Sequence, residues 1–469
     1  MSVGEQVIQM VGKIVKKDRE YPFTFNIESF ELEIHDYPAF FESLKNDNMP
    51  LFESKDILRG ISHDNKYHHV SFAVRSVLNN KVNSIVIRVQ FYVETYDEGK
   101  LFDSMSFSSP ELNSFYDIKQ AIEGSGFQMD GTTEIVIKKF DDTDIRHILG
   151  EDKEIDYIGF NFSRYINYGK PQPLTVYTDL QMMFNKQMDE LQVYEHYEQI
   201  KRFFSFITYR HNIRFDEIKL KEKTEGGKYR DFGRLCVYVD EANFYNEEEK
   251  VVQQRMIKEP YIRDKFVELF ELVRGQRLYM QHIPQNTADM RHVTPARFLM
   301  VTAAFEWEVQ EVYGDYKYEE NKKFREVTDT VYNILEVLKE KTTGKHKDYV
   351  KTYQKGFRYT GISLDEKIKY ALEDNNDILE GFIKVLYGLN NIDKDQYKYN
   401  EMAKRLSQQR NSYAHGKIDR DMEELVILDF IIMEWLLYSM RLKQLGLEEI
   451  TCKRIINDLF GRNVMIKDE

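Results

Sequence analysis

The sequence predicts a multi-domain α+β protein, in which a β-rich N-terminal region built as a sandwich or a barrel precedes an all-α helical bundle. The chain has 469 residues, which is more than a single hydrophobic core normally organises. Apolar and polar residues alternate along roughly the first 170 residues, as in half-buried strands. Over roughly the last 180 residues, apolar side chains recur every three or four positions, as in helices.

Five stretches of the N-terminal region have the alternation and the β-branched residues that are typical of strands. Turn-rich segments such as HDNKY, DEGK and MDGT separate them. The stretches cover residues 23–34, 68–78, 84–96, 133–140 and 157–168. Short strands at this spacing favour a sandwich or a barrel-like domain.

From Leu180 the apolar spacing becomes helical and predicts a helix to about residue 210. Two further strands are expected at 215–223 and 233–241, on either side of the turn EGGK. We therefore assign residues 1–250 to the β-rich region and 251–288 to a helical connector, with one or two helices over 260–282. The helical bundle takes residues 289–469.

The bundle has clear helix boundaries in its sequence. Thr294 and Pro295 predict an N-cap followed by the first helical residue. Ser363 with Glu366, and Asp421 with Glu424, have the spacing of capping boxes. The predicted helices, several of which stop at a glycine, cover residues 296–313, 319–341, 363–372, 377–389, 399–415, 421–445 and 447–460. Their short connections favour an antiparallel bundle.

The charge of the chain is unevenly distributed. Its net charge is -13. Residues 291–469 carry 29 Lys and Arg against 31 Asp and Glu, a net of -2, which leaves -11 for residues 1–290. An acidic front half argues against a protein that coats nucleic acid with a broad basic face, while a local cationic pocket in the C-terminal part stays compatible with this balance.

The most apolar segment, residues 425–438, is too short to cross a bilayer and contains Asp429 and Glu434. We expect a buried helix, no contact with a membrane and no signal peptide. Cys236 and Cys452 are far apart, which favours a reducing cytoplasm. No metal-ligand spacing and no phosphate-binding glycine loop are present, so we expect neither a metal nor another cofactor.

The stretch QQRNSYAHGKI, residues 408–418, brings an arginine, an asparagine and a histidine together at a predicted helix end. Asn411 and His415 are four residues apart and share a helix face, and the long side chain of Arg410 can reach that face. The helix C-terminus favours positive charge. The stretch is surrounded by the cationic residues Lys404, Arg405, Lys417 and Arg420. On their own, Lys404 and Arg405 read as a solvated helix face.

Such a cationic helix end suits metal-independent cleavage of RNA. A histidine can take the proton of the attacking ribose 2′-hydroxyl or protonate the leaving oxygen, and an arginine can stabilise the phosphoryl oxygens. One histidine cannot easily do both, which favours a site shared by two copies of the chain. The predicted helix 421–445 is apolar around most of its circumference, and we expect its second side to need a partner.

The spacing Arg410-Asn411-x3-His415, at the end of a late helix flanked by apolar helices, resembles the ribonuclease motif of the HEPN superfamily. The lead-in ARFLMVTAAFEWEV, the segment LDEKIKYALE and the β-rich front half are similar to the ApeA-like branch of anti-phage defence proteins. The resemblance implies a homodimeric endoribonuclease that cuts RNA, with transfer RNA as a candidate substrate. It assigns catalysis to Arg410, Asn411 and His415. Glu306, inside the lead-in, is a candidate for supporting the pocket, with an interhelical salt bridge as the alternative.

Two alternatives stay open. The helical domain could be a non-catalytic module for dimerisation or for binding a nucleotide or RNA. It could also be the toxin of a toxin–antitoxin pair, although such toxins are usually little more than the bundle. In the defence interpretation, residues 1–250 sense a phage-derived trigger or restrain the bundle.

Overall fold

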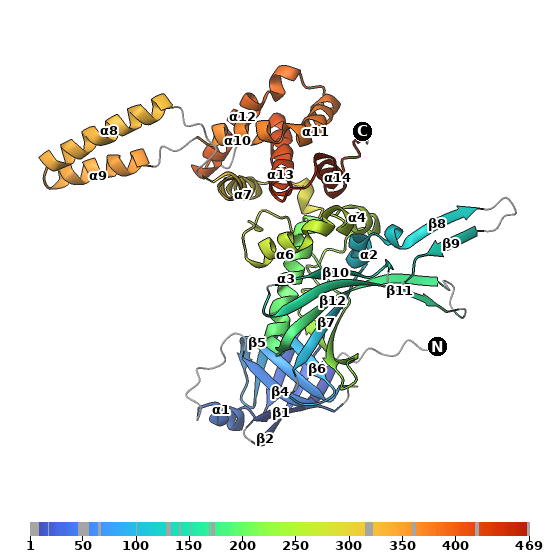
Figure 1. The fold of residues 1–469 in the computed structure, drawn as a ribbon. Coiled ribbons are helices and arrows are strands. Elements are labelled where there is room, and N and C mark those ends of the chain that lie inside the picture. Colours follow the sequence, from blue (N-terminus) through green and yellow to red (C-terminus); the bar gives the residue numbers. More distant parts are fainter. Residues whose placement is uncertain are drawn as a thin grey trace. The chain divides into compact units, whose positions relative to one another are not determined.

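The computed structural model describes most of the chain and divides it into two compact units. These are Met1–Arg274, here called the β-rich unit, and Gly275–Glu469, the helical unit (Figure 1). The division falls within the range 251–288. The described residues are 9–16, 18–45, 56–63, 67–99, 101–127, 133–139, 142–150, 152–167, 169, 174–314, 322–358, 363–417 and 422–466.

Six antiparallel strands of the β-rich unit close into a barrel, which confirms the barrel-like form of the predicted fold. Their order is β6-β3-β2-β1-β4-β5, and β5 pairs back onto β6. The bounds are β1 (Gln9–Lys16), β2 (Arg19–Asn26), β3 (Glu31–His35), β4 (Ile57–Ser62), β5 (His69–Asn80) and β6 (Ser84–Thr95). The stretch 23–34, predicted as one strand, is two strands, because a turn with Phe30 at φ 53° reverses the chain.

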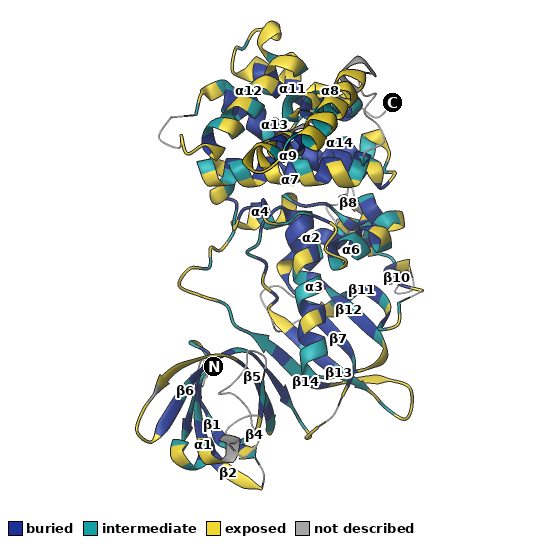
Figure 2. Ribbon diagram, turned by 90° about the vertical axis from the view of Figure 1, so that its left-hand side faces the viewer, coloured by how far each residue is buried: buried dark blue, intermediate teal, exposed yellow. Residues whose placement is uncertain are grey.

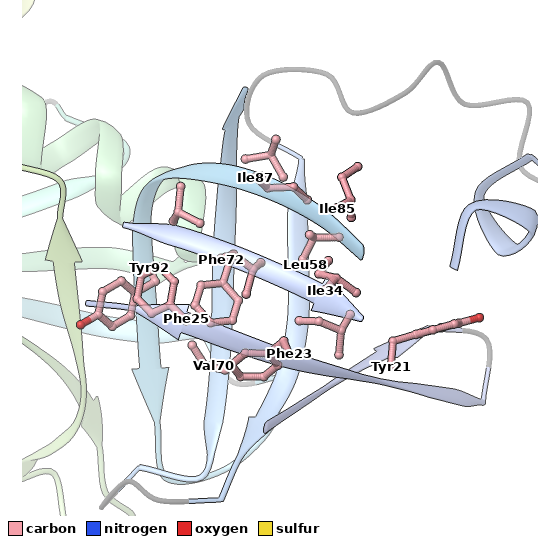
Figure 3. Packing of buried hydrophobic residues seen from close by; sticks show 14 of the residues in the cluster. Tyr21, Phe23, Phe25, Ile34, Leu58, Val70, Phe72, Ile85, Ile87 and Tyr92 are labelled. Atoms are coloured by element: carbon pink, nitrogen blue, oxygen red, sulfur yellow. The ribbon is translucent and has the colours of Figure 1, made fainter. Parts of the chain in front are cut away.

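The barrel interior is filled by the inward-facing residues of these strands (Figure 3). Phe25 on β2 packs against Phe72 on β5 at a ring-centroid distance of 4.8 Å and against Tyr92 on β6 at 5.0 Å. Burying a large apolar side chain contributes about 1.5–3 kcal/mol. The barrel is therefore held together by packed aromatic and aliphatic side chains from six strands.

The sheet continues beyond the barrel, because β6 pairs with β3 along its first half and with β14 along its second half. From β14 the order runs β13-β7-β12-β11-β10. The bounds are β7 (Phe102–Ser108), β10 (Ile145–Ile148), β11 (Ile155–Ile166), β12 (Leu174–Met188), β13 (Glu217–Lys223) and β14 (Tyr229–Val237), with β8 (Ile122–Phe127) and β9 (Thr133–Ile137) in a separate hairpin.

The helix predicted from Leu180 is wrong over its first turns. Residues 180–188 belong to β12, which pairs with both β11 and β7. The helix α3 (Glu190–Thr208) begins only after Asp189, whose side chain accepts a hydrogen bond from the Gln192 backbone in a capping box. Asp189 and Gln192 carry the sequence signal for this start. The apolar residues Leu180, Met183, Phe184 and Met188 before them also fit helical spacing, so the strand was read as part of the helix.

The remaining helices of the β-rich unit are short. They are α1 (Tyr37–Lys45), α2 (Pro110–Tyr116), α4 (Glu249–Gln254), α5 (Glu259–Ile262) and α6 (Phe266–Arg274). The prediction of helix over 260–282 is wrong beyond Arg274, since Gly275 follows and Gln276 has φ 53°, a left-handed conformation that ends a helix.

The helical unit confirms most of the predicted helix boundaries. Thr294 caps α7 with Pro295 as its first residue, and Ser363 and Glu366 form the expected capping box of α10. The bounds are α7 (Pro295–Tyr313), α8 (Lys322–Lys341), α9 (Lys345–Arg358), α10 (Leu364–Asp374), α11 (Asn376–Leu389), α12 (Tyr399–Ala414), α13 (Glu424–Gln444) and α14 (Glu449–Leu459). The box proposed for α13 is wrong: the helix starts at Glu424 after Glu423, and Asp421 lies outside the described residues.

The apolar helix α13 is the centre of the helical unit. It packs against α7, α11, α12 and α14, and nearly every residue from Leu428 to Leu442 is buried (Figure 2). Neighbouring helices of the same chain thus cover its whole circumference. The argument that its second side needs a partner subunit is therefore wrong, and a homodimer has to be supported on other grounds.

Candidate functional site

The candidate site lies at the C-terminal end of α12, where the chain leaves the helix in a Schellman motif. His415 is the C-cap residue, and Gly416 follows with φ 79°. The Gly416 N–H donates to the Tyr413 carbonyl at 3.0 Å, and the Lys417 N–H donates to the Ser412 carbonyl at 3.0 Å. Glycine at the left-handed position fixes where the helix stops, and this places His415 at the helix end.

Arg410 is held by a carboxylate from another helix. Its Nη2 lies 3.2 Å from Oε1 of Glu306 on α7, and both side chains are between one third and two fifths exposed. Nη1 is 3.5 Å from Oδ1 of Asn411, at the outer limit of a hydrogen bond. The structure therefore joins Arg410, Asn411 and Glu306 in one half-exposed cluster.

His415 and Asn411 are exposed to solvent. The backbone N–H of His415 donates to the Asn411 carbonyl at 3.1 Å, which places the two residues on successive turns. Within the described part of the chain, the imidazole of His415 has no hydrogen bond and no ion pair. It is accessible to a substrate or to a second protein chain.

The surrounding cationic residues differ from the predicted solvated face. Lys404 is exposed, as predicted, and pairs with Glu401 at 3.2 Å, and Lys417 is also exposed. Arg420 lies outside the described residues. Arg405, by contrast, points into the bundle, so its assignment to a solvated face is wrong.

Arg405 forms a buried network that fixes α12 against α13. Its Nε donates to Oδ2 of Asp429 at 2.7 Å and its Nη2 donates to Oδ1 at 3.0 Å, while the Tyr387 hydroxyl also donates to Oδ1. Burial raises the pKa of the fully buried Asp429 carboxyl, and the hydrogen bonds from Arg405 and Tyr387 oppose that rise. A bidentate arginine–carboxylate pair fixes both distance and orientation, so it sets the register of the helix that carries the site.

Two further ion pairs fix α7, which supplies Glu306. Arg297 pairs with the buried Glu434 of α13, and Nε of Arg441 on α13 donates to Oε2 of Glu308 at 2.9 Å. The sequence carries a signal for these two pairs and for the Arg405–Asp429 pair, although the sequence-based prediction did not include them. A charged residue inside an apolar helix needs a partner when it is buried, and α13 holds three, Asp429, Glu434 and Arg441.

The arrangement presents one guanidinium, one amide and one imidazole at a solvent-exposed helix end, with a carboxylate behind the guanidinium. These groups could bind a phosphodiester and move a proton. In the described residues no cluster of three or more His, Cys, Asp or Glu side chains is arranged to hold a metal ion. In the same residues, every helix is too short or too polar to span a lipid bilayer.

The fold and the site define a class of two-unit α+β protein, in which a closed barrel extended by an open sheet precedes a helical unit with a cationic helix end. A family model described as ApeA N-terminal domain 1 matches residues 26–271. The chain belongs to the ApeA family, and this membership associates it with anti-phage defence. Neither the curated proteins nor the solved structures give a match. The matched range ends before the helical unit, so the candidate site lies outside it.

Proposed function

We propose that the protein is a metal-independent endoribonuclease of anti-phage defence, and that its helical unit is a HEPN domain. The observation that carries the proposal is the end of α12, where the exposed His415 follows Arg410 and Asn411 in one turn-and-a-half of helix. RNA is the proposed substrate, with transfer RNA as a candidate, and the setting is the cytoplasm.

In this mechanism the ribose 2′-oxygen attacks the adjacent phosphorus, and the bond from phosphorus to the 5′-oxygen of the next nucleotide breaks. His415 accepts the 2′-hydroxyl proton or donates a proton to the leaving oxygen. Arg410 stabilises the charge on the phosphoryl oxygens, and Asn411 orients the phosphate. The products are a 2′,3′-cyclic phosphate and a free 5′-hydroxyl.

Glu306 supports this role by aligning Arg410. The 3.2 Å ion pair restricts the guanidinium while leaving it more than one third exposed, so its remaining N–H groups can meet a phosphate. An aligned donor stabilises a transition state without reorganisation. Two copies of the exposed helix end would supply one histidine as base and one as acid, which is the reason for proposing a homodimer.

The same ion pair favours a second candidate function. An arginine already neutralised by a carboxylate can serve as a structural link between α12 and α7, and the helical unit would then be a non-catalytic module that binds RNA or a nucleotide. This candidate differs from the first in chemistry, because it leaves RNA intact.

The test is RNA cleavage by the purified full-length protein, with and without EDTA. We expect fragments that end in 2′,3′-cyclic phosphate in both conditions, and a loss of about 10²–10⁴-fold in rate for His415→Ala. His292→Ala, which removes another exposed histidine of the helical unit, is the matched control and should cleave normally. Equal cleavage by both variants would reject the mechanism, and RNA binding without fragments, repeated with RNA and protein from infected cells, would favour the module.

A further inference from the structure

The helices α8 and α9 form a hairpin between α7 and α10 that the candidate site does not use. The two helices pack against each other, and Gly344, with φ 61°, reverses the chain between them. On α9 the inward side is marked by Val350 and Gln354, which are buried. Figure 2 shows most of α8 and α9 in the exposed colour.

The outward side of α9 exposes two large aromatic rings. Tyr349 is 63% exposed and Tyr353 is 65% exposed. Lys345, which is also exposed, precedes Tyr349 by four residues, as Tyr349 precedes Tyr353, so the three side chains form one stripe along the helix. Neither ring has an aromatic or hydrogen-bonding partner among the described residues.

The charge of α9 contrasts with that of the chain. The helix contains five lysine and arginine residues and one aspartate, a net of +4, in a protein whose net charge is -13. The next most basic helix of the described residues, α12, has a net of +2 from three basic residues and one acidic residue. A single strongly basic helix in an acidic protein attracts a polyanion locally and not over the whole protein surface.

Exposed aromatic rings beside lysines are the combination that binds single-stranded nucleic acid. Lysines contact the phosphates, and each exposed ring offers a face on which an unpaired base can stack. The tyrosines alone would also suit a protein partner, and the net charge of +4 on α9 is what favours a polyanion. The stripe is therefore complementary in charge and in shape to unpaired nucleotides of RNA.

We propose that α9 is an RNA-binding arm, in which Tyr349 and Tyr353 stack on unpaired bases and Lys345 contacts the backbone. This proposal rests on the proposed function, because it names where the helical unit holds the RNA that His415 and Arg410 cut. The arm recognises RNA by base stacking and charge, so it accepts unpaired loops of differing sequence.

The test measures equilibrium binding of a fluorescent single-stranded RNA to the full-length protein carrying His415→Ala, so that the RNA stays intact. Adding Tyr349→Ala and Tyr353→Ala together should weaken binding by about tenfold or more, since each stacked base contributes about 1–3 kcal/mol. Lys345→Glu should weaken binding and reduce its salt dependence. The matched control is Tyr165→Ala on β11, which removes a ring that is 56% exposed and should leave binding unchanged.

Unchanged RNA binding by the double tyrosine variant would overturn the proposal. The other exposed surface of the hairpin belongs to α8, where Val327, Ile334 and Leu338 have spacing suited to a coiled coil. If the tyrosine variants altered the molecular mass in light scattering and left RNA binding intact, the hairpin would be a contact with a second copy, and the RNA arm would be rejected.

These outcomes are separable from those of the nuclease proposal. Tyrosine-dependent RNA binding by a wild-type protein that never cuts RNA keeps the arm and rejects the nuclease. Tyrosine variants that bind and cut RNA normally would keep the nuclease and reject the arm.

Discussion

The barrel core of the β-rich unit and the interior of the helical unit are filled with different chemistry, although buried ion pairs such as Arg210–Glu111 also occur in the β-rich unit outside that core. The barrel core of the β-rich unit consists of packed apolar and aromatic side chains, such as Phe25, Phe72 and Tyr92. The helical unit instead places charged residues on its most buried helix. Asp429, with its two hydrogen bonds from Arg405, is the clearest case.

The comparison distinguishes the contacts that stabilise a unit from the contacts that position its functional residues. Packed rings stabilise a barrel from many directions, and no single contact determines its geometry. A buried ion pair often adds little net stability, because desolvation offsets the attraction, but its fixed geometry can determine how two helices align. In the helical unit, the aligned helices are α7 and α12, which carry Glu306 and Arg410.

The largest expected effect comes from breaking the buried pair. Asp429→Ala leaves the Arg405 guanidinium, whose side chain is only 16% exposed, without its buried partner, and should cost about 3–5 kcal/mol of unfolding free energy. Replacing both residues, Arg405→Met with Asp429→Leu, should recover a large part of that stability, because apolar side chains can substitute for a buried pair. Urea unfolding of the full chain measures both variants.

The matched comparison in the barrel is Phe72→Ala, which should cost about 3–5 kcal/mol by leaving a cavity. Restored stability in the double variant, together with slower RNA cleavage, would support the positioning role of the pair. If the double variant were as unstable as Asp429→Ala alone, the contrast between the two interiors would be wrong.

A slightly smaller effect is expected at the site itself. Arg410→Ala removes the proposed phosphate ligand and should slow RNA cleavage by about 10²–10³-fold, while a half-exposed side chain contributes little to folding. Arg59→Ala is the control, because Arg59 is also paired with a carboxylate, Glu190, but in the β-rich unit. Equal rates for the two variants, measured with the same RNA, would remove Arg410 from the mechanism.

The smallest effect is expected for the exposed pair on α12. Lys404 lies 3.2 Å from Glu401, and both side chains are about half exposed. Such pairs typically contribute 0–1 kcal/mol, so Lys404→Ala should change the urea midpoint only slightly. A loss of unfolding free energy as large as that of Asp429→Ala would contradict this prediction. The difference in exposure between Lys404 and Arg405 would then not explain their contributions to stability.

Local signals in the sequence predicted local structure well. Thr294 with Pro295 and Ser363 with Glu366 fixed two helix starts, because the groups that cap a helix lie within four residues of one another. Gly416 likewise predicted the end of α12 and the place of His415. These features depend on neighbouring residues, which a sequence displays directly.

Features that join distant segments were less accessible. The pairing of β5 with β6 that closes the barrel depends on register and twist across the whole sheet, and the sequence left sandwich and barrel open. Arg405 was misassigned because its partner lies 24 residues away on another helix. Glu306 was named as a candidate, but only the packing of α7 against α12 brings it to Arg410.

The measurement that tests the central claim most directly is RNA sequencing of phage-challenged cells that express the wild-type protein, His415→Ala or the control His292→Ala. The account predicts new RNA 5′ ends and protection from phage with the wild type and with His292→Ala, and neither with His415→Ala at equal protein abundance. Protection and the same RNA ends with His415→Ala would contradict it, because the reaction would then proceed without the imidazole at the end of α12.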